Sequence, residues 1–460
     1  MKAPERATPS AASLRRQRPA NPAIGLALAG GAPGGAIYEI CALHALNEAL
    51  VGLDLRDCGA YVGVSAGAFL SACLANGLST EKQVRAIVKH EPGEHPFVPE
   101  IFFQPAVGEL GKRLLRAPVL LAQGLRDYVT RREQRLVDAL TVVGRALPVG
   151  VFDNEPVADY VRKIFSIKGR TDDFRQLDRR LTVVATDLES GESTRFGHAG
   201  RMHVPISRAV QASAALPGLY PPVEIDGRYY VDGVLLKTMH ASVALEAGAD
   251  LVFCINPLVP VDTRKAVQQN LIPAGKVVRR GLVSVLSQTV RTMIHSRMSL
   301  GLRAYDTYYP DADVVLLEPP REDHEDFFSN IFSFSSRRAV CQNAFEVTRR
   351  SLRDRREELR PVLEKHGLGL DDEFLDAEHI DVWERVGLAD PQPQRFVTPR
   401  RGPGPDPTLT HDLGAALDRI ERLIAQRASA IAADASGAAA DASGTALEAS
   451  GTAVDASGYS

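Results

Sequence analysis

The sequence predicts an α/β protein in which a mostly parallel central sheet carries helices on both faces. The first observation is an apolar run at residues 24–29 that leads through a glycine loop into a helix-like pattern. The second is a short apolar run at residues 60–62, which leads through a tight turn into another helix-like segment. Further strand-like runs occupy residues 181–187, 251–255 and 313–317, with helix patterns between them. Strands that alternate with helices in this order favour a parallel sheet.

The net charge and the length of the apolar runs set the broad class of protein. The chain has 460 residues and a formal net charge of −3, so its overall field does not favour nucleic acid as a partner. No apolar run reaches the roughly 18 residues that a membrane span needs, and we expect no secretory signal at the N-terminus. The composition is that of a globular protein, and the length suggests two or three units.

The cysteines indicate the redox compartment. Their number is odd and none forms a C-x-x-C pair; they are Cys41, Cys58, Cys73, Cys254 and Cys341. Most lie within apolar runs, which is typical of buried thiols. We therefore expect free thiols in a reducing compartment, with neither disulfides nor a zinc site, and a cytoplasmic location.

The glycine loop after the first strand is a candidate oxyanion hole. Residues 30–35 read G-G-A-P-G-G, and a helix pattern follows them. Because Gly30 and Gly31 have no side chains, their backbone N–H groups can approach a carbonyl oxygen beside the helix N-terminus. The alternative is a dinucleotide-binding fingerprint. It is disfavoured because Ala32 holds the third glycine position and no acidic residue closes a second strand at the expected spacing.

The second strand ends in a candidate nucleophile. Residues 63–67 read G-V-S-A-G, and the order of strand, G-x-S-x-G and helix is that of a nucleophile elbow. The turn is tight, so only small residues such as Gly63 and Gly67 fit beside the serine. This arrangement exposes the Ser65 hydroxyl above a helix N-terminus, where it can attack an ester or thioester carbonyl.

Serine needs a base, and Asp232 is the best placed candidate. It follows a strand at residues 228–231, beyond a hairpin turn at Asp226-Gly227, and precedes Gly233. A carboxylate at a strand end can point across the sheet edge at the serine; the alternative is an ordinary turn aspartate. A histidine base is the other possibility. None of the three candidates, His240, His295 and His324, lies in a recognisable loop after a late strand.

Together these motifs resemble the patatin-like phospholipase family. The matching segments come in the family's order and cover roughly residues 22–256. They are residues 25–31 with Gly35, 63–67, 185–187, 212–217 and 225–233. The resemblance implies a three-layer α/β/α sandwich and hydrolysis of acyl esters in membrane lipids.

The resemblance also implies a role for each matching residue. Ser65 is the nucleophile and Asp232 the proton acceptor of a Ser–Asp dyad that has no histidine. Neither a metal nor an organic cofactor is implied. Backbone N–H groups of Gly30, Gly31 and Ala32 form the oxyanion hole, while Gly35, Gly63, Gly67 and Gly233 support the motifs.

Two features depart from the family pattern G-G-G-x-R/K-G. Ala32 replaces a glycine, and Gly34 stands where a basic residue is usual. Alanine still has an N–H group, so the oxyanion hole survives if φ is negative there. Val234 stands where the family has Gly or Ala after Asp-Gly, which tightens the floor beside the dyad. These departures bear on the substrate more than on the reaction type.

The remaining segments divide the chain into further parts. A helical insertion is expected at residues 81–150, either over the upper edge of the sheet or as a packing layer. A long charged helix at residues 337–365 is expected to break near Pro361. The predicted order is a disordered segment (1–21), catalytic domain (22–320), helical extension (321–390), linker (391–409), amphipathic helix (410–432) and disordered repeat tail (433–460).

A basic amphipathic helix is expected near residues 279–303. Such a helix can lie on an anionic membrane surface, although the same pattern occurs when the stripe is core and the basic face is solvated. The apolar stripe is Leu282, Leu286, Val290, Met293 and Met298, flanked by Arg279, Arg280, Arg291 and Arg297.

We therefore expect a serine acyl hydrolase that acts on lipids from the membrane periphery. Its partners would be a lipid or acyl-ester substrate and a membrane surface, not nucleic acid; the oligomeric state is open. Two alternatives remain: a soluble esterase or thioesterase that acts on monomeric acyl substrates, and a non-catalytic lipid-binding or scaffold protein.

Overall fold

The structure is a computed structural model that describes residues 21–88, 102–104, 106, 149–323 and 334–388. The chain divides into two units, Met1–Pro391 and Gln392–Ser460. The predicted N-terminal segment, linker, amphipathic helix and repeat tail lie outside the described residues, as does most of the predicted insertion. All the described residues lie in the first unit.

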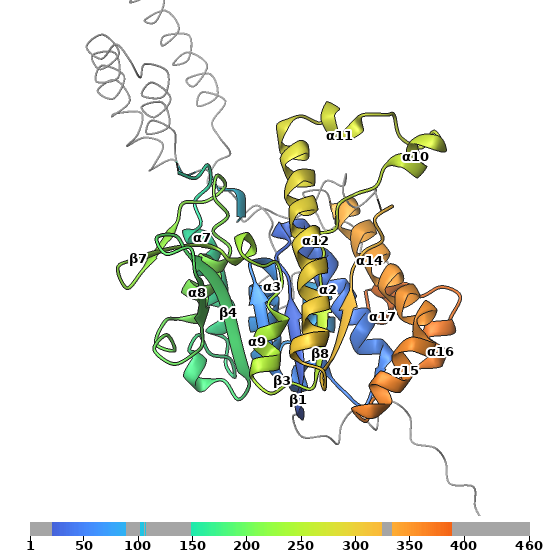
Figure 1. The fold of residues 1–460 in the computed structure, drawn as a ribbon, viewed down its shortest axis with the longest axis horizontal. Helices are drawn as coiled ribbons and strands as arrows, with labels where there is room; N and C mark the ends of the chain where they lie inside the picture. Colours follow the sequence, from blue (N-terminus) through green and yellow to red (C-terminus); the bar gives the residue numbers. More distant parts are fainter. Residues whose placement is uncertain (1–20, 89–101, 105, 107–148, 324–333, 389–460) are drawn as a thin grey trace, which may run out of the picture. The chain divides into compact units, whose positions relative to one another are not determined.

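An eight-stranded sheet forms its centre, in the order β6-β7-β4-β3-β1-β8-β9, with β5 also paired to β4 (Figure 1). Five strands are parallel to one another, and β5, β6 and β7 are antiparallel to β4 or to each other. The predicted α/β class with a mostly parallel sheet is confirmed. The parallel strands are β1 (Asn21–Leu28), β3 (Cys58–Val64), β4 (Arg180–Asp187), β8 (Leu251–Ile255) and β9 (Asp313–Leu317).

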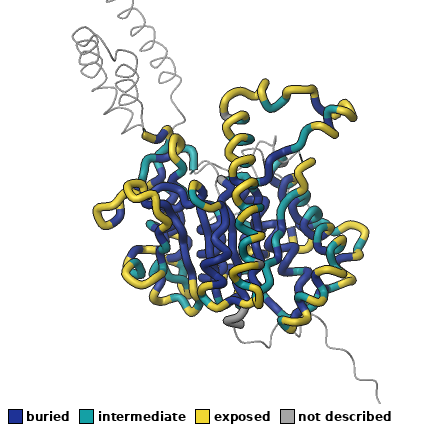
Figure 2. Tube along the Cα trace, viewed as in Figure 1, coloured by how far each residue is buried: buried dark blue, intermediate teal, exposed yellow. Residues whose placement is uncertain are grey.

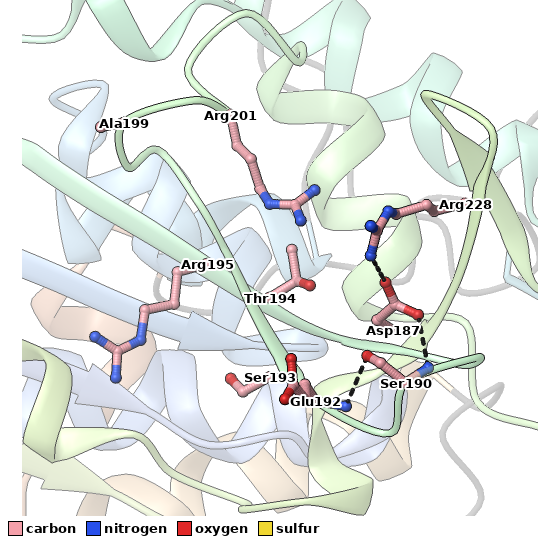
Figure 3. Close-up of a pocket in the computed structure, with 9 residues that line it drawn as sticks. All are labelled: Asp187, Ser190, Glu192, Ser193, Thr194, Arg195, Ala199, Arg201 and Arg228. Carbon is pink, nitrogen blue, oxygen red and sulfur yellow. Dashed lines mark hydrogen bonds and ion pairs between the residues drawn. The ribbon is translucent and has the colours of Figure 1, made fainter.

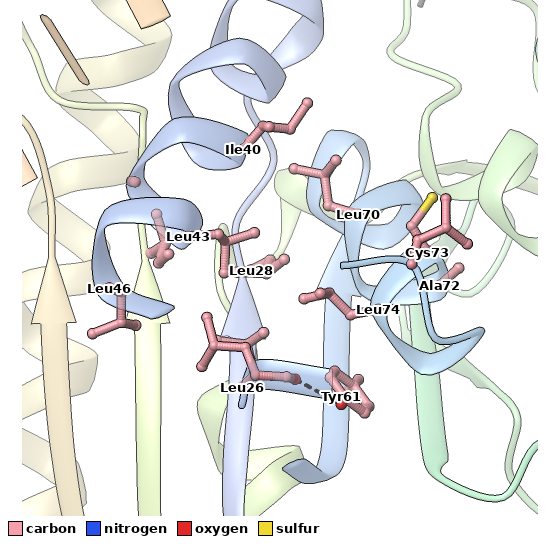
Figure 4. Packing of buried hydrophobic residues seen from close by; sticks show 14 of the residues in the cluster. Leu26, Leu28, Ile40, Leu43, Leu46, Tyr61, Leu70, Ala72, Cys73 and Leu74 are labelled. Carbon is pink, nitrogen blue, oxygen red and sulfur yellow. Dashed lines mark hydrogen bonds between the residues drawn. The ribbon is translucent and has the colours of Figure 1, made fainter. Parts of the chain in front are cut away.

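The central strands are buried on both faces because helices cover both sides. Side chains alternate along β1: Leu26 and Leu28 pack with one core cluster, and Ala27 packs with the other. The first cluster contains α2 (Ala32–Ala49) and α3 (Ala66–Ala75), as Figure 4 shows for part of it. The second contains α9 (Ala241–Glu246) and part of α12 (Leu282–Tyr308). Figure 2 shows the sheet as the buried centre between these layers.

The other elements surround this centre. Short strands are β2 (Leu50–Val51), β5 (Ser193–Phe196), β6 (Val223–Ile225), β7 (Arg228–Asp232) and β10 (Gly369–Leu370). Further α-helices are α4 (Thr80–Val88), α7 (Glu155–Phe165), α8 (Ile206–Ser213), α10 (Arg264–Gln268) and α11 (Lys276–Arg279). No helix in the described ranges is both long and apolar enough to cross a bilayer.

The C-terminal extension is helical and packs against the catalytic unit. It consists of α14 (Phe334–Asp354), α15 (Arg356–Lys365), α16 (Asp372–Asp376) and α17 (Val382–Arg385). The prediction of one long helix that breaks near Pro361 was wrong. The break falls at Arg355, and Pro361 lies inside α15. Pro361 is the sixth residue of α15, beyond the N-terminal N–H groups that lack an intrahelical acceptor, so the helix continues through it with one backbone hydrogen bond missing.

A disulfide joins Cys41 of α2 to Cys341 of α14, which corrects the prediction that every cysteine is a free thiol. The helices α2 and α14 pack along each other and bring the two cysteines together, with a Cα–Cα distance of 5.5 Å. Sequence spacing did not reveal the pair because 300 residues separate its members. The other three, Cys58, Cys73 and Cys254, are buried free thiols as predicted.

Candidate active site

The register of the sheet brings Ser65 and Asp232 together. β5 pairs with residues 183–186 of β4 and so occupies one edge of that strand. β3 pairs with residues 180–184 and β7 with residues 185–187, one after the other along the opposite edge. β3 ends with Val64 opposite Val184, and β7 ends with Asp232 opposite Ala185. The ends of these two strands therefore meet. Ser65, which follows β3, and Asp232, the last residue of β7, lie together at that point of the sheet.

The elbow has the geometry that exposes a serine. Ser65 has φ 53° and ψ −120°, a sparsely populated conformation for a residue with a side chain. The flanking glycines make it possible: a Cβ on Gly63 would lie 2.4 Å from the Gly67 carbonyl oxygen. A Cβ on Gly67 would lie 2.5 Å from the Ala29 carbonyl oxygen. The expectation that only small residues fit here thus has a steric basis in this fold.

Ser213 fixes the backbone of the elbow. The Ser65 N–H group donates to the Ser213 hydroxyl at 2.8 Å, and that hydroxyl donates to the Val184 carbonyl at 2.6 Å. One buried side chain thus ties the nucleophile's backbone to β4, through the last residue of α8. Sequence reasoning placed Ser213 in a family motif but gave it no role. Its position at the end of a helix before Pro217-Gly218 was the available signal.

Asp232 is buried beside the nucleophile. It is 2% exposed, and its carboxylate accepts hydrogen bonds from the Ser65 hydroxyl and, at 2.9 Å, from the Val234 N–H group. Burial raises the pKa of Asp232 to about 7, against the two hydrogen bonds, which lower it. A carboxylate with a pKa near neutrality is a far stronger base than an exposed aspartate, and it titrates where a general base is most effective.

The glycine loop lies next to Ser65 and Asp232, but its N–H groups are not all available as donors. The Gly30 N–H group donates to the Thr238 carbonyl at 3.3 Å, so it is not the free donor that we expected. Instead, Gly30 allows close packing: a Cβ there would lie 3.2 Å from the Ser65 Cβ and 3.4 Å from Val234. The remaining candidate donors are the N–H groups of Gly31 and Ala32, at the N-terminus of α2.

The two departures from the family loop fit the fold. Ala32 is the first residue of α2, and alanine suits a helical backbone. Gly34 lies in the first turn of the same helix and supplies no positive charge. Val234 is 8% exposed, packs beside Gly30, and donates its N–H group to Asp232.

Two of the three candidate histidines, His240 and His295, lie within the described residues. His240 is buried, and its pKa is lowered to about 3 by burial and then by Lys237 and Arg195. It is therefore neutral, and in the described part of the chain neither it nor His295 hydrogen bonds to Ser65 or Asp232. His324 lies outside the described residues. Of the candidate bases within the described residues, Asp232 is the one that interacts with the Ser65 side chain.

A separate polar cavity lies along the outer edge of β4 and β5 (Figure 3). Arg228 pairs there with Asp187 at 3.0 Å, and Arg201 donates to the Tyr230 hydroxyl at 2.7 Å. Neither Ser65 nor Asp232 lines this cavity, so the cavity is not part of the candidate active site. The lining consists of Asp187, Ser190, Glu192, Ser193, Thr194, Arg195, Ala199, Arg201 and Arg228.

The fold and the site define an α/β protein with a serine nucleophile elbow. Residues 26–245 match the family model "Patatin-like phospholipase". This part of the chain, just under half of it, is thus similar to patatin-like phospholipases, as its motifs suggested.

Related proteins agree with this family at modest identity. Uncharacterized NTE family proteins of Mycobacterium bovis and Mycobacterium tuberculosis are each 33% identical over 107 residues. The match spans 23% of this chain and only 27% of the length of those relatives.

Two solved bacterial structures resemble the chain more remotely. VipD from Legionella pneumophila matches with 13% identity and a TM-score of 0.32, over 79% of this chain and 72% of that one. ExoU from Pseudomonas aeruginosa, solved in complex with SpcU, matches with 14% identity and a TM-score of 0.20, over 61% and 53%.

Proposed function

We propose that this protein is a serine acyl hydrolase that cleaves carboxylic esters of lipids, as a phospholipase A does. The observation that carries the proposal is the hydrogen bond from the Ser65 hydroxyl to the buried Asp232 carboxylate, on a strained elbow beside the N-terminus of α2. The family supplies the substrate class.

The reaction would run through an acyl-enzyme. Asp232 takes the Ser65 proton as the hydroxyl oxygen attacks the acyl carbonyl, and the N–H groups of Gly31 and Ala32 stabilise the oxyanion. Collapse of the tetrahedral intermediate expels the alcohol, which takes the proton from Asp232. Water then gives a proton to Asp232 and attacks the acyl-enzyme, and the fatty acid leaves as Ser65 recovers its proton. The scheme needs neither a metal nor an organic cofactor.

Covalent labelling tests the proposal directly. A fluorophosphonate probe should label the wild-type protein, and Ser65→Ala should abolish labelling. Asp232→Asn should reduce it strongly, because the neutral amide cannot accept the proton. Labelling of Ser65→Ala at the wild-type rate would refute the assignment of the nucleophile. Full ester turnover by Asp232→Asn would refute the assignment of the base.

A soluble esterase or thioesterase is the second candidate, and one observation favours it. Gly34 replaces the basic residue of the family loop, so this loop provides no cation for a phosphate head group. Turnover of a short-chain soluble ester and of phospholipid vesicles should be compared at equal acyl-ester concentration. Faster turnover of vesicles supports the lipid hydrolase, and turnover confined to the soluble ester supports the alternative.

We also propose that the protein meets its substrate at the periphery of a membrane, because the substrate class is lipid. The cytoplasmic location was expected from free cysteines, and the Cys41–Cys341 disulfide removes that support. Disulfides persist mainly in oxidising compartments, so the compartment now has to be tested with the redox state of this pair.

A further inference from the structure

Helix α12 extends past the edge of the sheet that holds the site. Its C-terminal half packs on the sheet: Ile294 is buried in the second core cluster, and Met298 and Leu302 pack against it. The chain reaches α12 from β8, whose last residue, Ile255, accepts the N–H of Ala29 next to the glycine loop. The N-terminal half of α12, with α10 and α11, therefore projects beyond the active-site edge (Figure 1).

Two polar side chains brace this projection. Gln288 exchanges two hydrogen bonds with the backbone of Val261, at 3.1 and 2.8 Å. Arg291 donates to the carbonyls of Pro257 and Val259, at 3.1 and 3.2 Å. The prediction that Arg291 lies on an open basic flank was wrong, because it points inward; burial lowers its pKa to about 10. The projecting part is thus held in a defined place next to the site.

The end of the projection exposes large apolar side chains. We define the apolar tip as Leu271, Val278, Leu282 and Leu286, which are 64%, 71%, 72% and 53% exposed. Figure 2 shows this end of the chain as mostly exposed. Single exposed apolar residues are normal on proteins, but four large ones within one short projecting segment, residues 271–286, indicate an interaction surface.

The same segment is uniformly basic. Between Asp262 and Asp306 the sequence contains no aspartate or glutamate, although the whole chain has a net charge of −3. The arginines and lysines in this interval are Arg264, Lys265, Lys276, Arg279, Arg280, Arg291, Arg297 and Arg303. Lys276, Arg279 and Arg280 accompany the apolar tip. Arg291 is turned inward, Arg297 and Arg303 lie in the half of α12 that packs on the sheet, and Arg264 and Lys265 pair with Asp262 and Glu322. Such a surface is complementary to one that is both apolar and anionic.

We propose that the apolar tip docks the protein on an anionic lipid bilayer. The leucines and the valine enter the interface between head groups and acyl chains, while the surrounding lysines and arginines meet the anionic head groups. Because the tip projects from the active-site edge, docking there brings that edge to the lipid. The choice of a bilayer as occupant rests on the proposed lipid hydrolase; the main rival is a second copy of this chain.

Vesicle binding in a Ser65→Ala background tests the docking without hydrolysis. Sedimentation with phosphatidylglycerol-containing vesicles should exceed that with pure phosphatidylcholine vesicles and should fall as salt rises. Leu282→Ser with Leu286→Ser should weaken binding about a hundredfold or more, since burying each leucine is worth ~1.5 kcal/mol or more and about 1.4 kcal/mol is a factor of ten. The matched control is Leu300→Ser with Tyr308→Ser, at the other end of the helix and 65% and 75% exposed. It should bind as the parent does.

Three results would overturn the docking surface. They are unchanged binding by the tip variant, equal loss in the control, and a salt-independent interaction. A concentration-dependent dimer that only the tip variant abolishes would assign the tip to self-association instead. Fluorophosphonate labelling of the tip variant with Ser65 restored separates the two proposals. Tip-dependent binding without any labelling would refute the hydrolase alone, and labelling without tip-dependent binding would refute the docking alone.

Discussion

In the proposed reaction the carboxylate of Asp232 has to be ionised to accept the proton of Ser65, and its burial places that ionisation near neutral pH. Since burial raises the pKa to about 7, kcat/KM for a soluble ester should rise with pH up to about 7 and then level off. The measurement is a pH–rate profile of the free enzyme. A rate that is already constant from pH 4.5 upwards would contradict this environment for Asp232.

The same pKa makes stability depend on pH. The folded state binds the Asp232 proton more tightly than the unfolded state does. The stabilisation that this proton provides is complete below the unfolded pKa near 3.8 and is lost as pH rises to about 7. Asp232→Asn removes this titration, so the variant should gain stability relative to wild type by a few kcal/mol between pH 4 and pH 8. Denaturant unfolding of both proteins at pH 4 and pH 8 measures this gain in stability. A stability difference between variant and wild type that is the same at both pH values would contradict the prediction.

Ser213 is predicted to be a positioning residue. Ser213→Ala leaves the Ser65 N–H group and the Val184 carbonyl without this partner, which should destabilise the fold by about 1–3 kcal/mol. It should also lower kcat with little change in KM, because the elbow loses its anchor. Ser207→Ala is the matched control: Ser207 is buried in the same helix and bonds to Asp172 at 2.6 Å. The control should lose similar stability but keep its kcat, and an equal fall in kcat would leave Ser213 a purely structural role.

At the scale of the element, local patterns predicted the elbow and the hairpin because short-range sterics determine both. Asp226 and Gly227 do have positive φ, of 52° and 73°, as a two-residue hairpin turn requires. The contact between Ser65 and Asp232 depends on the register of β3 and β7 along β4, and that register is not visible in the sequence. We inferred Asp232 from its place at a strand end and from the family motif.

The contacts of the glycine loop and of α12 likewise depend on the tertiary fold, which local sequence patterns do not reveal. The Gly30 N–H group was predicted to be an oxyanion donor. It instead bonds to the Thr238 carbonyl, which only the tertiary fold brings to the loop. In α12 the apolar period was visible, but one half of the helix packs on the sheet and the other half projects. Met298 therefore faces the core, whereas Leu282 is exposed.

The crossing of β1, the elbow and α3 should tolerate no side chain at Gly67. A Cβ there would lie 2.5 Å from the Ala29 carbonyl oxygen, which belongs to the backbone that leads into the glycine loop. Gly67→Ala should therefore destabilise the protein by at least about 3 kcal/mol or prevent folding. Gly301→Ala is the control, because a Cβ in that part of α12 meets no atom within 4 Å. It should stabilise the protein by up to about 1 kcal/mol, and unfolding curves that rank the two variants the other way would contradict the crossing.

At the scale of the whole molecule, the Cys41–Cys341 disulfide joins the catalytic part to the C-terminal extension. It links α14 to α2, and the N-terminus of α2 carries the candidate oxyanion donors. The pairing of β2 with β10 and the ion pair between Glu48 and Arg385, at 2.8 Å, connect the same two parts. The extension thus supports the helix that borders the site, and its removal should affect activity through stability.

Thiol counting on the denatured protein tests this connection. Without reductant, three thiols should react, those of Cys58, Cys73 and Cys254, and five should react after reduction. Reduction should lower the stability of the wild type by about 2–4 kcal/mol, because the disulfide restrains the unfolded chain. Cys341→Ala should show the lower stability whether or not reductant is present. Five reactive thiols before reduction would mean that no covalent bond links α2 and α14. Packing alone would then hold the extension to the catalytic part.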